Sequence, residues 1–236
     1  MNFDLSEGQT MLADSIERFG TERWPVAERW RLLREAGANG VPGLWQEIAE
    51  LGWLMIPFTE DQGGLGGGFD DAMVLANGIG KHLIPVPVST NAVLIAPLLQ
   101  SCPAEFVEDV MTGKVRVALA LADGDSRFDH LNVATTAQRA GDGYALSGVK
   151  NFVADGGDAD YFIVPARTSG SGAALEGISL FLLSWETEGL SVETYRSVDN
   201  HRHCRLQLNG AEASAAALLG EDCLLYTSDA ADEEDS

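Results

Sequence analysis

The sequence predicts an α+β fold in which a helical half precedes a half built of short strands. Up to Gly113 the apolar residues recur every three or four positions, as on one face of a helix. After Gly113 they alternate with other residues, and Gly, Asp and Ser turns separate the runs, which indicates a small β-barrel or sandwich. We therefore expect a helical domain over residues 1–113 and a β domain over residues 114–222.

The first helix has a clear beginning. Ser6 and Gln9 have the spacing of a capping box, in which each side chain satisfies a backbone donor at the helix start. Leu12, Ile16 and Phe19 follow on one face, which we expect to be buried. Further helices are expected around Leu44–Leu51, Asp70–Leu83, from Ser89 or Thr90 to beyond Leu98, and around Phe106–Val110.

Glycines mark the ends of these helices. Gly52 and Gly113 each stand where a C-terminal glycine cap belongs. The run Gly63–Gly68 is expected to form a tight turn. It follows no strand and lacks the Gly-Lys-Ser/Thr ending of a phosphate-binding loop.

The strands of the second half are short. In the most informative stretch, Gly141–Gly156, a glycine-bounded turn leads into one strand and a second turn at Ser147-Gly148 leads into another, which carries Lys150 and Phe152. Strands are expected at Val115–Leu121, Leu131–Gln138, Tyr144–Ser147, Asn151–Val153, Tyr161–Arg167, Ile178–Leu183, Leu190–Tyr195 and Cys204–Leu208.

Charge and composition exclude several classes of partner. The formal net charge of −21 argues against nucleic acid and anionic membrane surfaces, which bind clustered Lys and Arg. No apolar run reaches the roughly 18 residues of a membrane span. Cys102 and Cys204 fit no metal or redox motif, and residues 1–5 do not resemble a signal peptide. We therefore expect a cytoplasmic protein.

The last residues differ from the rest of the chain. Cys223 to Glu233 resembles the translation of a sequencing adapter, and its acidic, Ala-rich composition has no apolar stripe to bury. We expect residues 223–236 to be an artefactual, disordered tail, and the natural chain to continue beyond Asp222.

Two pairs of polar residues could be proposed as functional sites, but their sequence context does not favour that interpretation. His201-x-His203 places two histidines on one face of an extended segment, but a zinc site needs four ligands and no second cluster accompanies them. A solvated loop or strand edge is the favoured interpretation. Asp123 and Asp125 are likewise interpreted as part of a solvated turn and not as a catalytic carboxylate pair.

Taken in order, these segments resemble the acyl-CoA dehydrogenase family. Residues 3–12 are similar to its first helix and residues 44–66 to its N-terminal motif, while Gly141–Gly156 resembles its G-D-G-Y-x-L-x-G-x-K-x-W/F segment. The resemblance implies that family's helical and middle β domains without the C-terminal helical bundle. The family's catalytic base is a Glu of that bundle, so no residue here is assigned as the base. Around residues 127–137 the chain is similar to the small subunit of pimeloyl-CoA dehydrogenase.

The resemblance also implies a binding site for FAD. The family stretch Y-x-x-T-E-P-x-x-G-S-D falls on residues 119–129, and the two Thr hydroxyls that contact the flavin are replaced by Ala122 and Ala154. Each lost hydrogen bond weakens binding by roughly 0.5–1.5 kcal/mol. The aromatic that packs against the flavin ring is kept as Phe152. The residues implied to contact the cofactor are Leu119, Leu121, Ala122, Phe128, Phe152, Val153 and Ala154.

The family activity is the α,β-dehydrogenation of an acyl-CoA. A proton leaves Cα and a hydride leaves Cβ for the flavin, whose electrons pass to electron-transfer flavoprotein or a similar acceptor. The resemblance implies a homo- or hetero-oligomer. One alternative is a non-catalytic, flavin-poor partner subunit, which the changes at Ala122, Phe128 and Ala154 favour. A flavin monooxygenase of the same fold is a further alternative.

Overall fold

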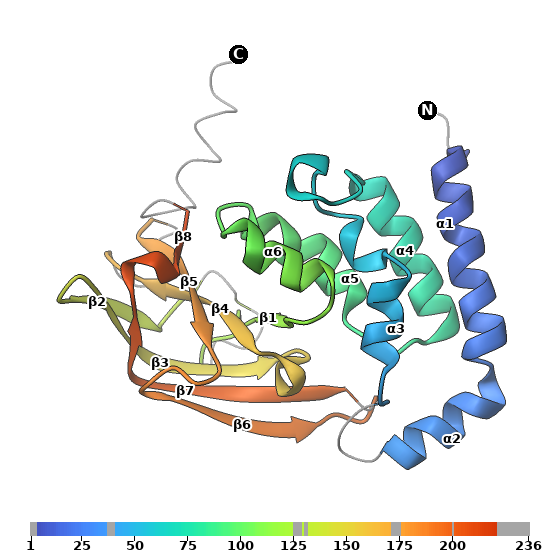
Figure 1. Cartoon of the computed structure of the whole chain (residues 1–236). Helices are drawn as coiled ribbons and strands as arrows, with labels where there is room; N and C mark the ends of the chain where they lie inside the picture. Colours follow the sequence, from blue (N-terminus) through green and yellow to red (C-terminus); the bar gives the residue numbers. More distant parts are fainter. Residues whose placement is uncertain are drawn as a thin grey trace. The chain divides into compact units, whose positions relative to one another are not determined.

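The chain divides into a helical unit and a unit built of strands. The computed structural model describes residues 4–36, 41–124, 129, 132–170, 176–199 and 201–220. The two compact units are Met1–Val115 and Arg116–Ser236, and Figure 1 shows helices in the first and strands in the second. The α+β order expected from the change of periodicity is confirmed. Asp125, Phe128 and residues 223–236, on which predictions were made, lie outside the described part of the chain.

The helical unit begins with the expected capping box. The Gln9 amide donates to Ser6 Oγ at 3.1 Å, and the Ser6 amide donates to Gln9 Oε1 at 3.0 Å. A π-helical turn, Phe19–Arg23, precedes Pro25, whose ring interrupts the helix. The helices of this unit are α1 (Glu7–Arg18), α2 (Val26–Ala36), α3 (Leu44–Glu50), α4 (Phe69–His82), α5 (Val88–Thr90) and α6 (Ala104–Met111).

Tryptophans form much of the core of this unit. Trp24 and Trp53 are almost completely buried, and the Trp53 ring meets Phe19 edge-on at a centroid distance of 5.5 Å. The indole of Trp24 donates to the carbonyl of Leu83 at 3.3 Å, so its polar atom is satisfied inside the core. The same cluster includes aliphatic residues of α1, α3 and α4, among them Ile16, Ile48, Leu75 and Ile79.

The glycine run is a tight turn, as expected. The Gly64 amide donates to the Thr59 carbonyl at 2.9 Å, and the Gly67 amide donates to the Ile56 carbonyl at 2.7 Å. A Cβ at Gly64 would lie 2.2 Å from the Phe58 carbonyl oxygen, so only glycine fits there.

The helix expected after Ser89 differs from the prediction. The chain winds as a π-helical turn over Asn91–Ile95 and as a 3-10 turn over Ala96–Leu99. Val93 and Leu94, expected to be part of this helix, are exposed. Pro97 lacks the N–H that a regular α-helix needs at that position, which explains the change of winding.

The second unit is one continuous sheet. Within the described residues its strands run in the order β6-β7-β3-β2-β4-β5-β8, and β1 pairs in parallel with β4 (Figure 1). The other full pairings are antiparallel. The strands are β1 (Val117–Leu119), β2 (Thr136–Ala140), β3 (Gly143–Val153), β4 (Tyr161–Arg167), β5 (Ile178–Ser184), β6 (Leu190–Arg196), β7 (Arg202–Ala213) and β8 (Leu218–Leu219).

The expected turn at Ser147-Gly148 is wrong. The hairpin turn is Gly141-Asp142, which joins β2 to β3, and β3 continues through Gly148 with a bulge beside it. A Cβ at Gly148 would lie 2.5 Å from Thr135 Oγ1. The glycine therefore permits the close approach of another segment and does not mark a turn.

A buried ion pair lies in this unit. Lys150 and Asp123 are 0% and 2% exposed, and the Lys150 ammonium donates to Asp123 Oδ2. The Thr135 amide donates to Asp123 Oδ1 at 2.7 Å, and its hydroxyl donates to the same oxygen. Burial lowers the pKa of Lys150, and the Asp123 carboxylate partly offsets that effect. The interpretation of Asp123 as part of a solvated turn is wrong, because its partners come from β3 and from the segment before β2.

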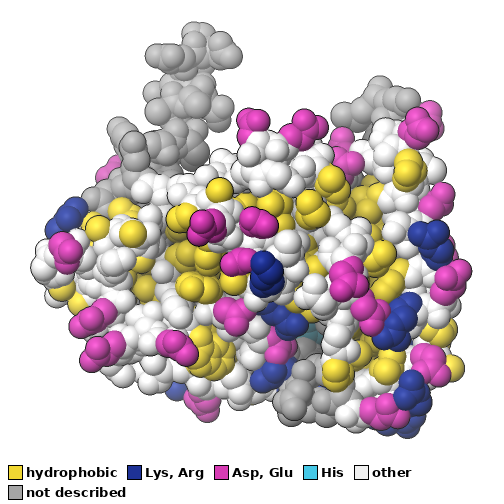
Figure 2. Space-filling model, viewed as in Figure 1, with side chains coloured by type: hydrophobic (Ala, Val, Ile, Leu, Met, Phe, Trp, Pro, Cys, Tyr) yellow, Lys and Arg dark blue, Asp and Glu magenta, His cyan; other side chains and the backbone are white. Residues whose placement is uncertain are grey.

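Acidic side chains are scattered over the surface. Figure 2 shows separate Asp and Glu side chains among hydrophobic and uncharged areas of the visible face, with Lys and Arg side chains between them. The sequence has 36 Asp and Glu residues and 15 Lys and Arg residues.

Removing Lys150 should strongly destabilise the β unit. Lys150→Met leaves the Asp123 carboxylate buried without a cation, which costs about 3–5 kcal/mol of unfolding free energy. Adding Asp123→Asn removes the stranded charge and keeps an acceptor for Thr135, so part of the loss should be recovered. Urea unfolding of the two variants measures both effects.

An exposed ion pair on the same sheet provides the control. Arg205 lies 3.9 Å from Glu193, and both side chains are largely exposed. Arg205→Ala should cost no more than about 1 kcal/mol. A Lys150→Met loss no larger than this would show that the buried pair does not support the fold.

Candidate functional site

The end of β3 carries an exposed aromatic ring. Phe152 is 60% exposed and has φ of +50°, a left-handed conformation that is rare for a bulky residue. One side of its ring packs against His203, with the ring centroids 4.5 Å apart. The phenyl group is therefore supported by protein on one side while much of its surface faces solvent.

The next two residues alternate between core and surface. The Val153 side chain is fully buried among the apolar residues of the sheet, so only its backbone could meet a ligand. Ala154 is exposed and begins the turn that follows β3. Of the three site residues expected here, Phe152 and Ala154 present side chains to the surface.

A second segment runs beside β3. The Asn151 amide donates to the Ala122 carbonyl at 2.7 Å, and the Gly124 amide donates to the Val149 carbonyl at 2.9 Å. These bonds and the Lys150–Asp123 pair bring Ala122 next to the residue that precedes Phe152. Ala122, Leu119 and Leu121 are half-buried, and Leu119 lies on β1 opposite Ile163.

His203 has a defined hydrogen-bonding arrangement. Its Nδ1 accepts from the Asp155 amide at 3.3 Å, so in the neutral ring the proton is on Nε2. Nε2 lies 2.7 Å from Ser197 Oγ and donates to it. The Ser197 hydroxyl also donates to Asp199, which gives a chain of bonds from the turn to the loop before β7.

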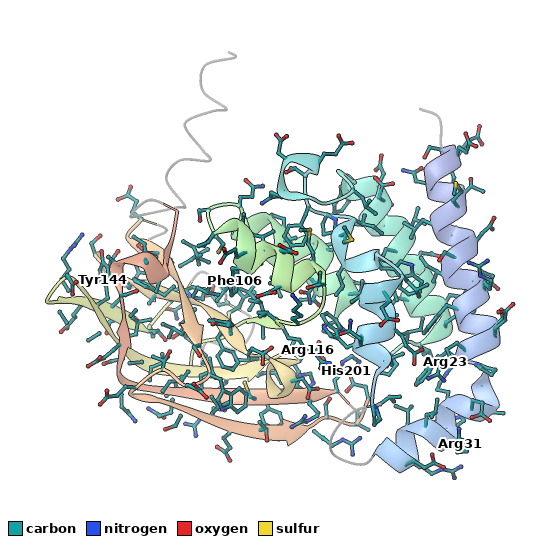
Figure 3. The ribbon with its side chains drawn as sticks, viewed as in Figure 1. Arg23, Arg31, Phe106, Arg116, Tyr144 and His201 are labelled. Atoms are coloured by element: carbon teal, nitrogen blue, oxygen red, sulfur yellow. The ribbon has the colours of Figure 1, made fainter. Side chains whose placement is uncertain are left out.

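His201 binds the side chain of Asp155, a residue of the same turn. Its Nδ1 lies 2.6 Å from Asp155 Oδ1, and Figure 3 shows it at the start of β7. The bond to Asp155 raises the pKa of His201, the charge of Asp199 adds to this, and partial burial opposes it. The prediction of a solvated loop or strand edge is wrong for His203, which is buried within β7, whereas His201 lies in the loop before β7 and is partly exposed. Their spacing of two did contain the signal, because it places both on the face toward Asp155.

The described residues offer no metal site. Among them, no group of three His, Cys, Asp or Glu side chains could hold a metal ion. The structure supplies a reason at His203, where both ring nitrogens have partners. Within the same residues, no helix is long and apolar enough to cross a membrane.

A groove also lies on the helical unit. It has a volume of about 690 Å³ and runs between α1 and α4, where Leu5, Met73 and Val74 line it with Asp and Glu side chains. None of the residues expected to contact a flavin lies in it.

Two family models match the chain in order. The N-terminal domain of acyl-CoA dehydrogenase matches residues 6–112, and the middle domain matches residues 118–211. The chain belongs to the acyl-CoA dehydrogenase family.

Relatives and solved structures agree with this assignment. L-prolyl-[peptidyl-carrier protein] dehydrogenase of Serratia sp. is 28% identical over 81% of this chain and 51% of its own length. The FAD complex of PigA has a TM-score of 0.82 and 25% identity, covering 97% of this chain and 62% of that one. A variant of the Tcur3481-Tcur3483 steroid ACAD has a TM-score of 0.78 and 28% identity, covering 95% and 60%. The chain spans about half the length of the curated relatives it matches.

The residues present fit part of a flavin. An exposed aromatic ring at Phe152 and half-buried apolar side chains at Leu119, Leu121 and Ala122 suit the apolar faces of the isoalloxazine. Neither Ala122 nor Ala154 can donate a side-chain hydrogen bond to its polar edge. The described site therefore offers an apolar wall, with backbone groups as its polar partners.

The His201–Asp155 bond should make stability depend on pH. The raised pKa means that the stabilisation is fully present below the ordinary value of 6.5 and is lost as pH rises through the folded-state value. Asp155, Asp199 and the His203 ring are the titratable groups that face His201. The stability difference between the native protein and Asp155→Asn should be larger near pH 5.5 than near pH 8.5, by about 1 kcal/mol.

Urea unfolding at both pH values measures this difference. Asn tolerates the left-handed backbone of residue 155 and still accepts a hydrogen bond, so the comparison isolates the charge. A difference that stays constant, or that grows with pH, would contradict the assignment.

Proposed function

We propose that the full-length protein catalyses the flavin-dependent α,β-dehydrogenation of an acyl-CoA thioester. The observation that carries the proposal is Phe152, an exposed aromatic ring at the position where the family places the wall of its flavin. The two family domains in their usual order support it, as does the likeness to the FAD complex of PigA.

The roles proposed for this chain are binding and positioning. Phe152 would pack against one face of the ring system, and Leu119, Leu121 and Ala122 would line its rim together with Phe128 and the backbone of Val153. When bound, FAD would supply the acceptor for the hydride that leaves Cβ. No residue of this chain is proposed to take the Cα proton. Electron-transfer flavoprotein or a similar protein is the proposed electron acceptor, and the cytoplasm is the proposed compartment.

A second function is favoured by one observation. Ala122 and Ala154 both lack the hydroxyl that the family uses toward the flavin, and Ala154 is exposed. A non-catalytic subunit that completes a heteromer could tolerate both changes. The likeness to the Tcur3481-Tcur3483 steroid ACAD, named as a pair, and the resemblance of residues 127–137 to the small subunit of pimeloyl-CoA dehydrogenase support this alternative.

Absorbance of the purified full-length protein tests the two functions. We expect a yellow protein after equilibration with FAD, and loss of the flavin absorption when acyl-CoAs of graded chain length, including a dicarboxylyl-CoA, are added without oxygen. A colourless protein that joins a second dehydrogenase subunit and does not retain FAD would contradict the enzyme proposal and support the alternative.

Restoring a hydroxyl should strengthen flavin binding. Ala154→Thr adds a hydrogen bond of roughly 0.5–1.5 kcal/mol beside the ring of Phe152, so the FAD dissociation constant should fall about two- to tenfold. Quenching of flavin fluorescence measures the constant for the full-length protein. Ala154→Val is the matched control, because it has the same shape without the hydroxyl, and it should not bind FAD more tightly than the native protein. Equal constants for Thr and Val would show that residue 154 does not face the flavin edge.

A further inference from the structure

The turn after β3 has an unfavourable backbone. Among the described residues, Leu83, Phe152 and Asp155 are the non-glycine residues with positive φ, and two of these lie within four positions of each other. Phe152 has φ of +50° and Asp155 has φ of +54°. L-residues avoid this region because Cβ approaches the following carbonyl oxygen. Such a conformation persists only where surrounding contacts determine it.

Those contacts come from two histidines at the start of β7. His201 Nδ1 holds the Asp155 carboxylate at 2.6 Å, and His203 Nδ1 accepts from the Asp155 amide at 3.3 Å. The His203 ring also supports the Phe152 ring, at 4.5 Å between centroids. Each strained residue is therefore held by at least one histidine.

The histidines are themselves fixed in place. Ser197 Oγ lies 2.7 Å from His203 Nε2, and the Tyr195 ring of β6 lies 6.0 Å from the His203 ring. The two imidazoles are stacked at 6.2 Å with planes 12° apart. β6 pairs along its full length with Arg202–Leu208 of β7, a stretch that contains His203 and directly follows His201, so the sheet supports both rings.

The turn also lies directly against β7. A Cβ at Gly156 would come within 2.5 Å of Cys204 Sγ, and one at Gly157 within 2.9 Å of Arg202 Cβ. Arg202 is ion-paired with Asp158 at the far end of the turn. The backbone of the turn therefore packs closely against β7, the strand that contains His203 and follows His201.

We propose that His201 and His203 form a clamp that fixes the turn of residues 152–155 and thereby sets where Phe152 and Ala154 stand in the flavin site. The effect on the flavin site rests on the proposed function, whereas the clamp itself rests on the contacts described above. Both histidines are positioning residues, since they act through Phe152 and Asp155. The clamp makes the flavin wall depend on β7, a strand that carries none of the predicted flavin contacts.

Removing His201 from the full-length protein tests the clamp. In His201→Ala, the amides of residues 152–158 should exchange with deuterium about tenfold faster, because a hydrogen bond to a charged group is lost. His201→Asn places an amide donor near the position of Nδ1 and should recover most of the protection. Arg205→Ala, farther along the same strand and paired with Glu193 of β6, should leave the exchange unchanged.

A double-mutant cycle distinguishes loss of the His201–Asp155 hydrogen bond from a general loss of stability. Asp155→Gly removes the carboxylate and also relieves the left-handed strain. In that background, His201→Ala should add no further increase in exchange, because the partner is already absent. An equal increase in both backgrounds would mean that His201 acts elsewhere, and it would overturn the clamp.

FAD titration supplies the second readout. If Phe152 is positioned by the clamp, the FAD dissociation constant of His201→Ala should rise several-fold while that of Arg205→Ala stays unchanged. Faster exchange with an unchanged constant would overturn the positioning role. If the native protein binds no FAD, the proposed function fails, and the exchange data alone then decide whether the clamp exists. Unchanged exchange in His201→Ala would overturn the inference in every case.

Discussion

The Lys150–Asp123 contact joins the segment after β1 to the middle of β3. Neither charge could remain in this interior alone, because an unpaired buried ion costs several kcal/mol. Each is therefore required by the other, and the Thr135 bonds complete the set. As a result, the residues around Ala122 and the end of β3 behave as one structural element. A ligand that contacts both segments would therefore bind a surface whose two parts are joined by the buried Lys150–Asp123 pair.

A second constraint acts on the surface side of the same strand. Beyond Lys150, β3 ends in a turn whose backbone is strained at Phe152 and Asp155, and two histidines of β7 hold it. The buried ion pair fixes the strand, and the imidazoles fix its end. This division explains how an aromatic ring can be largely exposed and still have a defined position.

The chain has the two family domains in order. In the proposed flavin site, Phe152 would form the wall, and alanines stand at positions 122 and 154, where the resemblance implies hydroxyls. Apolar packing and backbone groups would then supply more of the cofactor's binding energy. The proposed enzyme and the proposed partner subunit differ in whether those remaining interactions suffice, since both use the same scaffold.

The sequence alone determined what depends on near neighbours: the order of helices and strands, the Ser6–Gln9 cap, the glycine turn and the likeness to a family. Tertiary structure decided whatever depends on partners far along the chain. Asp123 is buried because Lys150, 27 residues later, reaches it. His201 is ordered because Asp155, 46 residues earlier, lies against it. Gly148 is needed by the approach of Thr135 and not by a turn. Periodicity and caps are local and can be predicted from sequence, whereas burial and pairing of polar groups are set by which distant segments the sheet brings together.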